Sequence, residues 1–161
     1  MQDSNNRRPP VGENRTIPNH DYNQNNNFGI QVSVSQLKSD FKLDWIRNGA
    51  DQEMIDYADK VGEFTKNNQL TTTKIRNLYG EIKRIQSKNN FKDEKSSIYL
   101  LKARFAYAYG REKDVKIKNA LEVLLNIFKE SVQCINDNET YNNYCNLMEA
   151  IIAFHRYYGG K

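Results

Sequence analysis

The amino-acid sequence predicts an all-α fold, a compact bundle of about five helices behind a disordered N-terminal extension. No proline occurs from residue 19 to residue 161, so long helices can form there without interruption. Apolar residues in this part of the chain recur at steps of three and four, which is the period of amphipathic helices. Short clusters of Asn, Asp and Gly separate these stretches and favour tight connections between neighbouring helices.

The first 35 residues differ in composition from the remainder. They contain all three prolines and only 8 apolar residues, and such a segment buries too little apolar surface to offset the entropy lost on ordering. Residues 36–161 contain 53 apolar residues out of 126, an ordinary share for a globular domain. We therefore expect a disordered Asn/Gln-rich extension at 1–35 and one helical-bundle domain at 36–161.

Two long helices are expected in the first half of this domain. A short turn or helix at 44–47 leads into a helix at about 51–66, with Asp51 as its N-cap. The second long helix runs from the cap Thr71 to about residue 88, and a continuous apolar stripe follows the cap. The pair of asparagines at 89–90 is expected to end it.

Three further helices are expected in the second half. The third covers about 96–109, starting at one of two serines, with Gly110 as its C-terminal cap. It is apolar nearly all round, which predicts a central position in the bundle. The fourth begins at the cap Asp114 and extends for about 20 residues. The fifth follows a turn at 136–138 and ends at 159–160.

Groups that could carry catalysis are scarce. His20 lies in the extension, and His155 lies on the apolar stripe of the fifth helix, where packing is the favoured interpretation. Cys134 and Cys145 form neither a CxxC pair nor a disulfide framework, and we expect them to be buried, reduced thiols. No phosphate-binding, dinucleotide-binding or nucleophile-elbow motif occurs. We therefore expect no enzyme activity, no metal site and no cofactor.

The chain is expected to be cytoplasmic, without a membrane partner. Its longest uninterrupted apolar run has at most five residues, whereas a membrane span needs about 20. Met1–Pro10 lacks the apolar stretch of a secretory signal.

Positive charge is concentrated in the middle of the chain. Residues 66–118 have a net charge of +9, whereas the flanking segments 36–65 and 119–161 have net charges of −3 and −2. A basic segment between two acidic ones favours a surface that faces a polyanion. A solvated run of lysines is the alternative that charge alone leaves open.

The expected second helix turns much of this charge outward. Arg76 and Lys83 stand seven residues apart and therefore share a side. Arg84 extends the same face, and Glu81 is the only acidic residue of the helix. Gly80 interrupts this face at a cost of about 1 kcal/mol relative to alanine. Close approach of a neighbouring helix or of a nucleic-acid strand would explain a glycine there.

The expected third helix carries one polar stripe. Arg104, Tyr107 and Arg111 stand at i, i+3 and i+7, whereas Lys102 points to another side. Arginines beside a tyrosine can bind phosphates while the ring stacks on a base. No helix-turn-helix spacing, zinc-finger ligand set, RNP aromatic motif or GXXG loop occurs, which favours backbone binding over base reading.

Three segments resemble a known family. Residues 70–78, LTTTKIRNL, resemble a helix start written LTTSKIR, and residues 105–111, FAYAYGR, resemble a helix end written YxxGR. Residues 148–161, MEAIIAFHRYYGGK, resemble a chain end written MEAxVAYxKxYGGK. These are motifs of the small subunit of type III-A CRISPR effector complexes, the Csm complex. His155 stands where that family varies, so the resemblance gives it no special role.

The resemblance implies a non-catalytic structural subunit. Several copies would stack head to tail inside a ribonucleoprotein and contact guide RNA and target RNA, with a large subunit and backbone subunits as neighbours. In that family target-RNA cutting belongs to the backbone subunits. Base pairing would supply sequence specificity, as in other RNA-guided effectors.

The expected RNA contacts follow from the motifs and from charge placement. Lys74 and Arg76 of the first motif and Arg111 of the second are carried over from the family. Charge placement and the last position of the third motif add Lys83, Arg84, Lys102, Arg104 and Lys161.

Two other functions remain open at this point. A helical protein–protein adaptor would use the basic face to dock an acidic partner. If the face instead binds nucleic acid, nucleic acid should displace an acidic protein, and binding should fall log-linearly with salt. A ribonuclease that uses His155 would lose cleavage but keep binding in His155→Ala.

Overall fold

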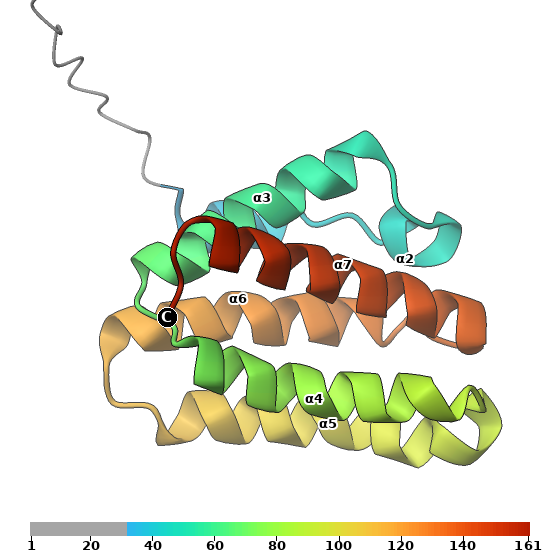
Figure 1. The fold of residues 1–161 in the computed structure, drawn as a ribbon. Coiled ribbons are helices and arrows are strands. Elements are labelled where there is room, and N and C mark those ends of the chain that lie inside the picture. The colour runs from blue at the N-terminus through green and yellow to red at the C-terminus, as the bar shows by residue number, and fades with distance from the viewer. Residues whose placement is uncertain (1–31) are drawn as a thin grey trace, which may run out of the picture. The chain divides into compact units, whose positions relative to one another are not determined.

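The computed structural model describes residues 32–161, and these residues form seven α-helices and no β-strand (Figure 1). The predicted all-α fold is thereby confirmed. Most of the predicted extension, residues 1–31, lies outside the described residues. The helices are α1 (Val34–Asp40), α2 (Asp44–Asn48), α3 (Gln52–Asn67), α4 (Thr72–Lys88), α5 (Phe91–Arg111), α6 (Val115–Ser131) and α7 (Asn138–Tyr157).

Polar side chains fix where six of these helices begin. Each of these cap side chains accepts a hydrogen bond from a backbone N–H of the first turn of its helix. The caps are Ser33, Asp51, Thr71, Asn90, Asp114 and Asp137. Such a cap satisfies one of the N–H groups that the helix leaves free at its start. The predicted caps Asp51, Thr71 and Asp114 are confirmed. Asn89 ends α4 in the left-handed conformation, with φ at 47°.

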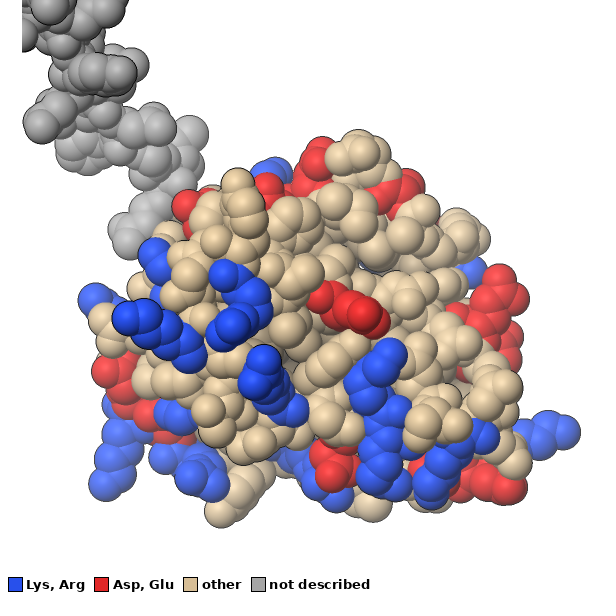
Figure 2. All heavy atoms as spheres, viewed as in Figure 1, with Lys and Arg blue, Asp and Glu red and all other residues tan. Residues whose placement is uncertain are grey.

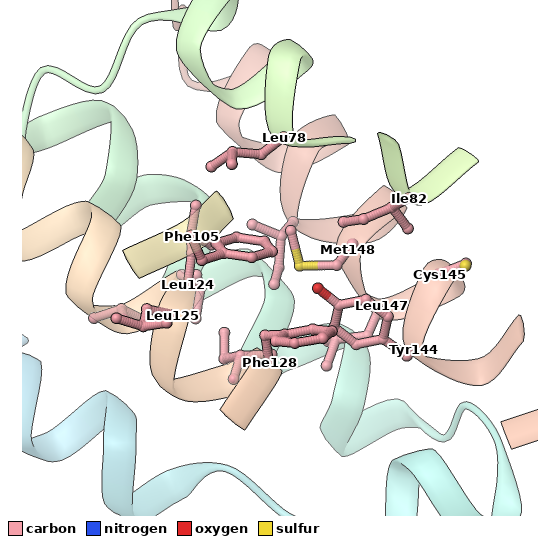
Figure 3. Packing of buried hydrophobic residues seen from close by; sticks show 14 of the residues in the cluster. Leu78, Ile82, Phe105, Leu124, Leu125, Phe128, Tyr144, Cys145, Leu147 and Met148 are labelled. Carbon is pink, nitrogen blue, oxygen red and sulfur yellow. The ribbon is translucent and has the colours of Figure 1, made fainter. Parts of the chain in front are cut away.

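Contacts of α6 and α7 hold the bundle together. α7 packs against α2, α3 and α4, and α6 packs against α1, α3 and α5. In the core, the Phe128 ring of α6 stacks on Phe105 of α5, with centroids 5.5 Å apart, and meets Tyr144 of α7 edge-on at 5.4 Å (Figure 3). α4 and α5 lie side by side along one side of this core (Figure 1).

The position of α5 differs from the prediction. The pattern of its apolar residues predicts a central helix, but its buried side chains Ile98, Leu101 and Phe105 lie on one side only. Leu100 and Tyr107 are 61% and 68% exposed. The central position is therefore wrong, because no helix within residues 32–161 covers the outer side of α5.

The ends of α5 also differ from the prediction. The helix begins at Phe91 instead of near 96, because Asn90 caps it and a polar first turn follows. Gly110 lies inside the helix, which continues to Arg111, so the predicted glycine cap is wrong. Glu112 is the residue after the last turn, in extended conformation.

The sequence pattern does not predict α1. Only Leu37 of its seven residues is buried, so it shows no periodic apolar stripe. Ser33 caps it, and the Tyr57 hydroxyl donates a hydrogen bond of 3.0 Å to the Leu37 carbonyl, which ties α1 to α3. α1 begins at Val34, within the last two residues of the range 1–35 that is predicted to be the extension.

Candidate nucleic-acid interface

α4 and α5 carry most of the residues that the sequence predicts to contact RNA. Seven of the residues predicted to contact RNA lie on these two neighbouring helices: Lys74, Arg76, Lys83 and Arg84 on α4, and Lys102, Arg104 and Arg111 on α5. Figure 2 shows Lys and Arg side chains spread over the region that α4 and α5 occupy in Figure 1, with a few carboxylates between them.

A groove of about 530 Å³ lies between α4 and α5. Apolar side chains form much of its lining: Leu78 of α4, Leu100, Leu101 and Tyr107 of α5, and Leu121 of α6. Charged side chains of both signs complete it: Lys74, Arg104 and Arg111 with Glu81 and Glu112. The lining of the groove is therefore part apolar and part charged.

Two of the cations at the groove are held by carboxylates. Lys74 forms an ion pair with Glu112, and its hydrogen bond lowers the pKa of Glu112 to about 2. Arg104 Nη1 lies 3.4 Å from Glu81 Oε1, and Arg84 Nε lies 3.2 Å from Glu81 Oε2. These pairs partly neutralise Lys74, Arg84 and Arg104, so each is less available to a phosphate than a count of charges predicts.

Lys83 lies toward α7 and does not line the groove. Its Nζ lies 3.6 Å from Glu149 Oε2, which also accepts a hydrogen bond of 3.0 Å from the Tyr79 hydroxyl. Burial and this hydrogen bond raise the pKa of Tyr79 above its usual range. The three side chains link α4 to α7 at the surface.

Arg76, Lys102 and Arg111 are exposed and form no ion pair with another residue of the described range 32–161. The guanidinium carbon of Arg111 lies 5.6 Å from the centroid of the Tyr107 ring, within the range of a cation–π contact. Tyr107 and Arg111 stand at i and i+4 on α5, and this spacing brings the two side chains into contact. Arg76, Lys102 and Arg111 are thus the predicted residues of α4 and α5 that are most available to phosphates.

Lys161 lies beside the start of α4. The Thr72 N–H donates a hydrogen bond of 2.5 Å to the backbone oxygen of Lys161, and the Lys161 side chain is exposed. The preceding Gly160 packs against His155, because a Cβ at Gly160 would lie 2.1 Å from His155 Nε2. A side chain would not fit at this position, which explains the glycine.

His155 is fully buried, so the predicted packing role is confirmed. Its Nδ1 lies 3.0 Å from Thr65 Oγ1, which joins α7 to α3. Burial, together with the nearby Arg156, lowers the pKa of His155, so the ring is neutral at pH 7. Cys134 and Cys145 are buried free thiols, as predicted.

Residues 32–161 contain neither a candidate metal site nor a membrane-spanning helix. No group of three or more His, Cys, Asp or Glu in this range could hold a metal ion. None of the helices in this range combines the length and the apolar character that crossing a membrane requires.

Two features of this surface escape prediction from the sequence. Tyr99 and Leu100 on the outer side of α5 are 53% and 61% exposed, whereas the apolar pattern of the sequence predicts that they lie in the core. At Gly80, a Cβ would meet no atom of residues 32–161 within 4 Å. Close packing by a neighbouring helix in this range therefore does not explain Gly80.

Similarity to known proteins agrees with the three sequence motifs. The model of the family Csm2 Type III-A matches residues 49–161. A relative from Streptococcus thermophilus, called CRISPR system Cms protein Csm2, is 30% identical over 121 residues, which are 69% of this chain and 95% of the relative. A relative of the same name from Enterococcus italicus is 29% identical over 101 residues, which are 56% of this chain and 69% of the relative. The chain therefore belongs to the Csm2 family, the small subunits of type III-A CRISPR effector complexes, as the motifs predict.

Proposed function

We propose that this chain is a structural subunit of a type III-A CRISPR ribonucleoprotein that binds the backbone of guide and target RNA through the α4–α5 surface. The observation that carries the proposal is a set of three exposed cations on two neighbouring helices, Arg76, Lys102 and Arg111, which form no ion pair within residues 32–161. Membership in the Csm2 family supplies the setting.

Contacts of this kind are independent of RNA sequence. Lys and Arg bind phosphate oxygens, which every nucleotide carries. Sequence specificity then comes from pairing between guide and target, while the protein positions the strands. Such a division of labour needs no base-reading motif in this chain.

We further propose that several copies act together in the complex, beside a large subunit and backbone subunits, in the cytoplasm. One copy offers few phosphate contacts, so its own affinity for RNA is expected to be low. Copies aligned on one strand raise the overall affinity through effective concentration.

A catalytic role is not part of the proposal. His155 is buried and cannot touch a substrate. Burial raises the pKa of the Cys145 thiol to about 12, so it carries almost no thiolate at neutral pH. If the purified protein cleaved RNA and His155→Ala abolished that cleavage, this part of the proposal would be wrong.

The salt dependence of RNA binding tests the proposal. Arg76→Gln and Arg111→Gln should each weaken binding with little dependence on sequence, and each should reduce the slope of log K against log salt by about 0.7 to 0.9. Lys60→Gln on α3 is the matched control, because it removes the same charge from an exposed position outside α4 and α5. Unchanged slopes in both arginine variants would contradict the assignment.

The adaptor function has one observation in its favour, the apolar lining of the groove between α4 and α5. If the chain is an adaptor, an acidic protein partner should stay bound when RNA is added. Displacement of such a partner by RNA would instead support the RNA-binding function.

A further inference from the structure

The outer side of α5 is an exposed surface without charge. From Ser96 to Gly110 the residues at its centre are Ser96, Tyr99, Leu100, Ala103, Tyr107 and Gly110, all exposed. The two tyrosines and the leucine are more than half exposed, at 53%, 68% and 61%. A large apolar face of this kind on a soluble protein indicates a binding site.

Cations flank this surface on both sides. Lys95 and Lys102 stand seven residues apart along one flank, and Arg104 and Arg111 stand seven apart along the other. Each pair is separated by about 10.5 Å along the helix axis. Apart from the ion pair of Arg104 with Glu81, no ion pair within residues 32–161 involves these four side chains.

The two tyrosines are placed to hold flat, apolar groups. Tyr99 and Tyr107 are eight residues apart, about 12 Å along the axis. Tyr107 lines the groove of about 530 Å³, and the guanidinium of Arg111 lies over one face of its ring, 5.6 Å from the centroid. A flat group that stacks on the ring would therefore lie next to a cation.

We propose that the outer side of α5 binds unpaired RNA, with bases on Tyr99 and Tyr107 and phosphates on the flanking cations. The proposal rests on the proposed RNA-binding function and names the form of RNA that this surface selects. An unpaired strand presents base faces and phosphates together, whereas a duplex hides its base faces in the stack. Only the unpaired strand matches both the apolar centre and the cationic flanks.

Charge argues against a symmetric pairing of two α5 helices. Pairing through this face would bring the flanking Lys95, Lys102, Arg104 and Arg111 of both copies together, and like charges in contact are unfavourable. An RNA strand instead supplies the negative charge that these flanks complement.

Affinities for one short RNA, single-stranded and annealed to its complement, test the proposal with the full-length chain. Tyr99→Ala and Tyr107→Ala should each weaken single-strand binding by at least about fivefold, the loss typical of one stacked base. Binding of the duplex should change little. The salt slope should stay the same in these variants, because no phosphate contact is removed.

Two controls separate stacking from other effects. Tyr157→Ala removes a tyrosine of α7 that is 79% exposed, and it should leave both affinities unchanged. Tyr107→Phe keeps an aromatic face and should retain single-strand binding. Circular dichroism checks that each variant is folded.

The outcomes distinguish this inference from the proposed function. Equal binding of single strand and duplex, with loss only in Arg76→Gln and Arg111→Gln, would overturn the inference and keep the function. Absence of RNA binding by the unmodified chain would overturn both. Binding of an acidic peptide that Tyr99→Ala or Tyr107→Ala abolishes, with RNA binding unaffected, would show that the face docks protein and would overturn the inference.

Discussion

Lys74 shows how an ion pair reduces the charge that a predicted contact residue offers to RNA. Its ammonium group is paired with Glu112, 38 residues later in the chain. The pKa of Glu112 is lowered to about 2 by this hydrogen bond, so the carboxylate is ionised at neutral pH. The charge of Lys74 is therefore partly offset by Glu112 at neutral pH, although the motif of Lys74 predicts an RNA contact.

Removing the partner charge should release Lys74. We predict that Glu112→Gln strengthens RNA binding and steepens the salt slope by about 0.7 to 0.9, the value of one added phosphate contact. Equilibrium titrations at several salt concentrations measure both quantities. Glu122→Gln is the control, because Glu122 pairs with Lys38 of α1, at 2.8 Å, outside α4 and α5. An effect of equal size in both variants would show that net charge alone matters.

Sequence reasoning at the residue scale finds the cations but not their partners. Lys74, Arg104 and Lys83 are visible as charge in the sequence, and the motifs add weight to Lys74. Their partners Glu112, Glu81 and Glu149 lie on other elements. Such pairs depend on how helices pack, which local patterns do not contain.

The contact between α3 and α7 depends on Gly62. A Cβ at Gly62 would lie 2.5 Å from Phe154 Cβ and 2.8 Å from His155 N. These atoms belong to the backbone and the first side-chain carbon, so they cannot move without shifting α7. A glycine therefore lets the two helices approach closely.

Gly62 and Gly80 give a matched pair of substitutions. We predict that Gly62→Ala lowers the free energy of unfolding by about 1 to 3 kcal/mol, because it overpacks the contact of α3 with α7. Gly80→Ala should raise it by up to about 1 kcal/mol, because alanine favours the helix and its Cβ meets no atom within 4 Å. Urea denaturation measures both. Equal effects of the two substitutions would contradict this account of Gly62.

The elements with strong periodicity were predictable from sequence, and the others were not. α3, α4, α6 and α7 combine a polar cap with a long apolar stripe, so their starts and faces follow from local pattern. α1 buries only Leu37 and leaves no such stripe. α5 has apolar residues on its buried and its exposed sides, and a sequence does not show which side the core occupies.

At the scale of the whole molecule, charge is divided between surfaces. The exposed side of α3 carries Glu53, Asp56 and Glu63 with Lys60, whereas α4 and α5 carry most of the basic residues of segment 66–118. This division is visible in the sequence as net charges of −3 for residues 36–65 and +9 for residues 66–118. The acidic residues of α3 and the basic residues of α4 and α5 thus stand on different helices, which is consistent with the RNA-binding surface that we propose on α4 and α5.

Crosslinking in the native complex tests the central claim most directly. The tagged chain would be irradiated in its native cells and purified, and the RNA, proteins and crosslinked peptides would be identified. Our account predicts guide RNA, a large subunit and backbone subunits, with RNA crosslinked to peptides of α4 and α5. Recovery of one acidic protein without RNA, or crosslinks confined to α3, would contradict it.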